Sequence, residues 1–176
     1  MKILFDKNPM PPTFWPVSWI APAEDKLPSL THYRLTFQVE EPAVIILHVT
    51  ADEQYRLYLD GKLVGRGSDS GSLSHWYFDS WQVELTPGTH ELTAKVPCWG
   101  IGSELGPQAR ISQRPAFLLA ASDTWMEKLG TGLADWKCTV EPLEVTGNCA
   151  VIHCRYRDHD GEPLGPIRIL YRGRSA

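Results

Sequence analysis

The chain has 176 residues, 43% of them apolar and 22% charged, which is typical of a globular protein with one sizeable core. Acidic and basic residues are interspersed, the net charge is −4, and no run of Lys and Arg stands out, so we expect neither nucleic acid nor an anionic membrane as a partner. The apolar run before Asp6 is too short for a signal sequence or a membrane span, which predicts a cytoplasmic protein.

Proline dominates the first 29 residues, where Trp15 and Trp19 are interspersed with it. Proline removes a backbone donor and restricts its neighbour, so no long helix fits here. We expect residues 1–29 to form an extended, proline-rich N-terminal arm that packs on the outside of the domain through its aromatic side chains.

Two strands are predicted next. Residues 33–39 alternate between apolar and polar side chains, which is typical of a strand with one buried face. Residues 44–49 are apolar on both faces until His48, which predicts a central strand covered on both sides.

Turn chemistry organises residues 52–96. Tyr55, Leu57 and Leu59 alternate with polar residues, and an Asp-Gly pair at 60–61 predicts a tight hairpin onto the next strand. Pro87-Gly88 predicts a second turn between strands at 81–85 and 91–96. Together these signals predict a β-meander.

The remaining chain is also rich in strands. A glycine-rich loop leads to a buried strand over 116–121, and a helical turn is plausible near Glu104 or over 125–128. Residues 150–156 and 167–171 look like a hairpin that either completes the domain or begins a truncated next module. We therefore predict an all-β antiparallel β-sandwich over 30–140, with little helix, followed by a C-terminal extension over 141–176.

Four segments in this order carry a resemblance to a known family. They are Y-R-L-Y-L-D-G-K-L-V-G-R-G at 55–67, W-Y-F-D at 76–79, L-T-P-G-T-H-E-L at 85–92 and D-T-W-M-E-K-L-G-T-G-L-A-D-W-K at 123–137. The chain over roughly 15–140 resembles the N-terminal, non-catalytic β-sandwich domain of bacterial α-L-rhamnosidases, a galactose-binding-like, jelly-roll module. In that family the acidic catalytic residues sit in a separate helical barrel, and nothing in this sequence corresponds to it. The resemblance implies that this chain alone is not an enzyme.

The acidic residues support no catalytic assignment. A glycosidase needs two carboxyl groups at a fixed separation. The candidates all lie at predicted turns, where carboxylates normally face water, namely Asp52-Glu53, Glu40-Glu41 and Asp158 with Asp160. We expect no catalytic residue among them.

The cysteines and histidines predict no metal site. Cys149, His153, Cys154 and His159 are close in sequence, but their spacing matches no zinc pattern. The absence of a signal sequence predicts buried free thiols instead of disulfides for the four cysteines. We expect neither a metal nor another cofactor.

Aromatic residues around two long loops are the best candidates for a ligand site. The loops follow residues 65 and 98 and are rich in Gly and Ser, whereas the other turns are short. An exposed ring can stack on a sugar and an arginine can bind hydroxyls or a carboxylate. This predicts carbohydrate binding by Arg66, Trp76, Tyr77 and Trp99. Alternatively, the rings are all core or pack against a catalytic module.

Two functions follow. The first is an accessory, non-catalytic domain of an α-L-rhamnosidase-like glycoside hydrolase, implied by the resemblance, whose partner is a rhamnose-containing glycan or the surface of a catalytic module. The alternative is a stand-alone carbohydrate-binding or protein-interaction module.

Overall fold

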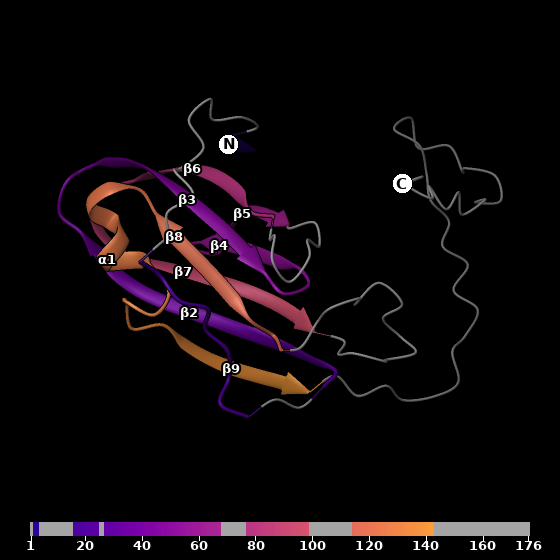
Figure 1. Ribbon diagram of the computed structural model, residues 1–176. Coiled ribbons are helices and arrows are strands. Elements are labelled where there is room, and N and C mark those ends of the chain that lie inside the picture. Colours follow the sequence, from indigo (N-terminus) through magenta and orange to yellow (C-terminus); the bar gives the residue numbers. More distant parts are fainter. Residues whose placement is uncertain (1, 4–15, 25–26, 68–76, 99–113, 143–176) are drawn as a thin grey trace, which may run out of the picture. The chain divides into compact units, whose positions relative to one another are not determined.

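The computed structural model describes residues 2–3, 16–24, 27–67, 77–98 and 114–142 (Figure 1). The chain divides into two compact units, Met1–Glu144 and Val145–Ala176. The second unit lies outside the described residues, as do the predicted hairpin, Cys149, Cys154 and the helical turn near Glu104. The first unit contains all the strands and helices that the structure describes.

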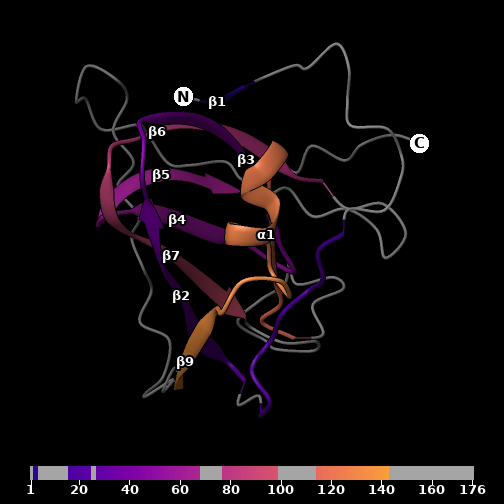
Figure 2. The ribbon, with the colours of Figure 1, turned by 90° about the vertical axis from the view of Figure 1, so that its left-hand side faces the viewer.

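The described strands form two antiparallel sheets, which face each other in Figures 1 and 2. The four-stranded sheet has the order β1 (Lys2–Ile3), β6 (Asp79–Leu85), β3 (Ala43–Ala51), β8 (Phe117–Ala121). The five-stranded sheet has the order β5 (Lys62–Gly67), β4 (Tyr55–Leu59), β7 (Gly88–Cys98), β2 (Ser29–Val39), β9 (Lys137–Pro142). A 3₁₀ turn, η1 (Asp123–Trp125), and a single turn of helix, α1 (Met126–Leu129), follow β8.

The core lies between the two sheets. In most of the strands alternate residues point inward and are buried, because successive side chains of a strand point to opposite faces. From the five-stranded sheet these are mainly Tyr33, Leu35, Phe37, Val39, Tyr55, Leu57, Leu92, Ala94 and Val96; from the four-stranded sheet they are mainly Ile45, Leu47, Val49, Trp81, Val83, Leu85, Phe117, Leu119 and Ala121. The predicted all-β sandwich with little helix is confirmed.

The Asp-Gly hairpin is also confirmed. Asp60 and Gly61 both have positive φ, 50° and 75°, as a primed turn requires. The β4–β5 register shifts between Leu57 and Tyr58, so the hairpin carries a β-bulge.

The predicted meander is wrong. β6 and β7 are consecutive but do not pair: β6 pairs with β1 and β3, and β7 pairs with β2 and β4. The turn at 86–88 carries the chain from one sheet to the other. Alternation shows that each strand buries one face, but it does not show whether the next strand continues the same sheet or faces it across the core.

Two further expectations about burial are wrong. β3 is central but not covered on both sides, because Val44 on its outer face is 63% exposed. Cys98 is buried as expected, whereas Cys138 on β9 is exposed. β9 is an edge strand with mostly exposed side chains, and this placement was not evident from the sequence.

Side chains from both sheets contact each other near one end of the core. The residues of β5 that face this contact are both glycine. The Trp81 indole nitrogen donates a hydrogen bond to the Tyr55 hydroxyl (2.8 Å), which donates to Asp79 Oδ2 (3.0 Å). A Cβ on Gly65 would overlap the Trp81 ring, and one on Gly67 would overlap the Asp79 carboxylate. Burial and the neighbouring Asp79 charge raise the pKa of Tyr55 far above its usual value, so its hydroxyl remains a donor. We call this group the inter-sheet clamp.

His90 holds two turns together at the opposite end. Its Nδ1 lies 2.6 Å from Asp60 Oδ2 and its Nε2 lies 2.7 Å from the carbonyl oxygen of Thr86. Both ring nitrogens therefore face acceptors, which favours the protonated ring. The hydrogen bonds to Thr86 and Asp60 raise the pKa of His90. Desolvation by itself would raise the pKa of Asp60. Hydrogen bonds from the Glu91 amide and from His90, together with the charge of His90, outweigh this effect and lower the pKa below its usual value.

Gly65→Ala should destabilise the domain. Its new methyl group would overlap the Trp81 ring, and overpacking of this kind costs about 1–3 kcal/mol. Urea unfolding of single and double variants provides the measurement. The cost should fall sharply in a Trp81→Leu background, since the smaller side chain leaves room; an equal cost in both backgrounds would show that the ring contact is not the cause.

The His90 pair should make stability depend on pH. Because the folded pKa of His90 is raised above 6.5, its stabilising contribution is complete below pH 6.5 and is lost as pH rises through the folded value. The melting temperature should therefore decrease as the pH rises above 6.5, and His90→Gln should reduce this pH dependence. His32→Gln, on the outer face of β2, is the control; a pH dependence that survives in His90→Gln but is lost in the control would contradict the assignment.

Candidate functional site

The two long loops start from one end of the five-stranded sheet. β5 and β7 both run antiparallel to β4, so Gly67 and Cys98 lie at the same end, where β4 and β2 begin. β6 begins there too, since the Tyr55 hydroxyl reaches Asp79. We call this the loop end. The loops themselves, residues 68–76 and 99–113, lie outside the described residues.

Two of the four predicted sugar-binding residues are described. Arg66 is exposed on the outer face of β5. Tyr77 is 58% exposed, and its carbonyl oxygen accepts a hydrogen bond from Thr50 Oγ1 at 2.7 Å, which ties the residue to the end of β3. Trp76 and Trp99 lie outside the described residues, so the gathering of all four remains a prediction.

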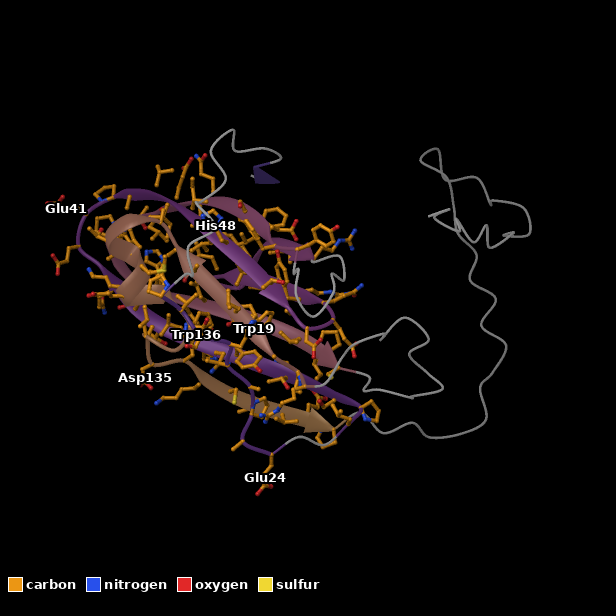
Figure 3. The ribbon with its side chains drawn as sticks, in the orientation of Figure 1. Trp19, Glu24, Glu41, His48, Asp135 and Trp136 are labelled. Carbon is orange, nitrogen blue, oxygen red and sulfur yellow. The ribbon has the colours of Figure 1, made fainter. Side chains whose placement is uncertain are left out.

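An exposed aromatic surface continues from Tyr77 onto the four-stranded sheet. Phe78 is 44% exposed, and its ring lies edge-on to His48, with centroids 5.6 Å apart. His48 Nδ1 lies 2.8 Å from Ser80 Oγ on the neighbouring strand (His48 is labelled in Figure 3). Exposed rings beside polar hydrogen-bonding groups suit a sugar.

The sequence analysis named Tyr77 as a candidate but not Phe78. Both residues precede β6, which begins at Asp79, and both are exposed. His48 and Ser80 could have been recognised only by knowing that β3 and β6 are neighbours.

Asp52 and Glu53 were expected to face water because they lie at a turn, but the structure buries both. They are only 6% and 9% exposed. The Asp52 amide donates to the Ala116 carbonyl oxygen (3.0 Å), and Asp52 Oδ2 accepts from the Arg114 amide (3.1 Å). Asp52 thus fastens the β3–β4 turn to the segment that leads into β8, which is a structural role.

Basic side chains form a row across the outer face of the five-stranded sheet. Arg66 lies opposite Arg56, Arg56 opposite Lys95, and Lys95 opposite His32, on the adjacent strands β5, β4, β7 and β2. The interspersed basic residues of the sequence are therefore clustered in space, contrary to the absence of a cluster in the linear chain. Like charges that face each other across strands are destabilising.

The first three members of this row make no ion pair with any residue that the structure describes. The neighbouring carboxylates serve other groups: Glu91 lies 3.3 Å from Arg34 and Glu141 lies 3.4 Å from His32. We call Arg66, Arg56 and Lys95 the cation row.

Neither a metal site nor a membrane span is found in the part of the chain that the structure describes. No three His, Cys, Asp or Glu side chains there are grouped so as to hold a metal ion. No helix there has the length and apolar character needed to cross a membrane.

Comparison with known proteins gives a fold relationship. No family model and no curated protein matches the chain. Among solved structures, it matches part of the GH78 family rhamnosidase of Bacillus sp. GL1, with a TM-score of 0.54 and 19% sequence identity. The match covers 72% of this chain but 13% of that chain. At this identity the comparison establishes a shared fold, and the chain spans a small part of that enzyme's length.

Proposed function

We propose that this chain is an accessory, non-catalytic β-sandwich domain of an α-L-rhamnosidase-like glycoside hydrolase, with a structural or carbohydrate-contacting role. The observation that carries the proposal is the fold shared with a segment of a GH78 family rhamnosidase. The segments resembling the rhamnosidase domain agree with it: 55–67 forms the β4–β5 hairpin, and 85–92 contains the turn that joins the two sheets.

Two carboxylates at the loop end, Asp52 and Asp79, support a non-catalytic role. Asp52 accepts the Arg114 amide, and Asp79 accepts the Tyr55 hydroxyl in the inter-sheet clamp. Both groups hold the fold together, whereas a glycosidase needs one carboxyl group free to give a proton and a second free to act as base or nucleophile.

The exposed aromatic surface supports the carbohydrate-contacting role. Tyr77 and Phe78 expose ring area at the loop end, and His48 and Ser80 supply polar groups beside them. Solvation of such rings is unfavourable, so a ligand or a neighbouring module that covers them gains free energy. A stand-alone binding module, the alternative function, would use the same surface.

The purified chain should not hydrolyse an aryl rhamnoside above the uncatalysed rate. Asp52 and Asp79 at the loop end are engaged in structural hydrogen bonds, and the family that the sequence resembles places catalysis in a separate barrel. Release of the aryl group, followed by absorbance, is the measurement. Turnover that one Asp or Glu substitution abolishes would overturn the non-catalytic role.

Tyr77→Ala and Arg66→Ala should each weaken binding of neutral, rhamnose-containing oligosaccharides by roughly tenfold, as expected for loss of one stacking or hydrogen-bonding group. Both side chains are exposed, so the melting temperature should hardly change. Titration calorimetry measures affinity, and Leu133→Ala, at an exposed apolar position that belongs to neither surface, is the control. Equal weakening by the control, or an equal loss of stability in all variants, would count against a sugar site at the loop end.

A further inference from the structure

The cation row is not explained by the stability of the fold. Its side chains come from three adjacent strands and point outward, because the residues that alternate with them, Tyr55, Gly65 and Ala94, face the core. Arg66 and Arg56 are exposed and Lys95 is half-buried. Three cations side by side oppose folding, so a domain that keeps them needs an anion elsewhere to offset their repulsion.

The geometry of the row favours a linear anion. Adjacent strands lie about 4.8 Å apart, so the three cations follow each other at about that interval across the sheet. This interval is comparable to the length that one pyranose unit adds to a polysaccharide. Guanidinium groups bind carboxylates through two parallel hydrogen bonds, which suits the carboxylate of a uronic acid.

Tyr58 helps to fix the row. It lies on the same outer face, and Lys95 Nζ lies 5.7 Å from the centroid of its ring. This cation–π contact holds the ammonium group on the face before any ligand arrives. The ring edge also extends the surface on which a sugar can rest.

Other classes of partner fit less well. Nucleic-acid binding draws on many phosphate contacts and a basic domain, whereas this chain carries a net charge of −4. The centre of a protein interface is depleted of lysine and other charges, yet the centre of this face is the cation row.

We infer that the outer face of β5, β4 and β7 binds an acidic polysaccharide, with Arg66, Arg56 and Lys95 contacting its uronate carboxylates. The inference rests on the proposed carbohydrate-contacting function and assigns the ligand class of a second surface, on a different sheet face from the aromatic surface at Tyr77. Arg66 is common to both assignments, so the two surfaces are tested separately through Tyr77 for one and through Arg56 and Lys95 for the other.

The test uses the full chain and polygalacturonate in calcium-free buffer, with fully methyl-esterified polygalacturonate as a neutral polymer of the same backbone. We expect binding to the acidic polymer that weakens with added salt and little binding to the ester. Arg56→Gln with Lys95→Gln should weaken binding at least about tenfold without lowering the melting temperature, because like-charge repulsion is relieved.

Arg34→Gln is the matched control. It removes one positive charge from the same face, half of what the double variant removes, and Arg34 is paired with Glu91, so affinity should change less than about twofold. Tyr77→Ala should leave binding to polygalacturonate unchanged. If polygalacturonate does not bind, the inference fails. The proposed carbohydrate-contacting role is tested separately, by the effect of Tyr77→Ala on the binding of neutral, rhamnose-containing oligosaccharides.

Four other outcomes overturn the inference. Equal weakening by Arg34→Gln would show that only the overall charge of the face matters. Equally tight binding of duplex DNA would point to nucleic acid or any polyanion, and equally tight binding of polyglutamate would point to an acidic protein. Equal binding of the methyl ester would show that the carboxylates are not recognised.

Discussion

The inter-sheet clamp is the contact on which the geometry of the loop end depends. Trp81 and Asp79 come from one sheet and Tyr55 from the other, so their hydrogen bonds join the two layers directly. Gly65 and Gly67 make room for them at a place where any side chain would push the sheets apart. Since β5 and β6 flank the loop over residues 68–76, the clamp also sets the distance that this loop must span.

Much of the fold could be predicted from residues that act locally. The Asp-Gly hairpin, the buried strand at 116–121 and the alternating strand that became β2 each follow from a short pattern, because turn conformation and face alternation are decided by neighbours in sequence. The predictions that failed concerned which strands, other than the two of a tight hairpin, become neighbours and which faces are covered. The meander and the double cover of β3 both depend on which strands become neighbours, and alternation carries no information on that point.

The same limit applies to the candidate site. Tyr77 and Arg66 were identified by residue type and loop position, and the structure leaves both exposed. His48 beside Ser80, and the cation row, arise only from cross-strand register, so no segment of the sequence displays them. Conversely, Asp52 was expected in water from its place at a turn, but the turn folds back against the segment before β8 and buries it.

The two outer faces of the sandwich have different chemistry, because each belongs to a different sheet. The four-stranded sheet presents rings and polar groups near the loop end, and the five-stranded sheet presents the cation row. Inward positions are constrained by packing, whereas outward positions are free to vary. A sandwich of this kind can therefore carry two unrelated binding surfaces without any change in its core.

The bulge in the β4–β5 hairpin has a consequence for association between molecules. β5 is an edge strand, and a regular edge offers unpaired amides and carbonyls to any other strand that approaches. The bulge between Leu57 and Tyr58 breaks the regular pairing, and the charged Lys62 and Arg66 are carried on the same strand. Because a distorted, charged edge is a poor template for a further strand, the hairpin protects the chain from growing into sheet-linked aggregates.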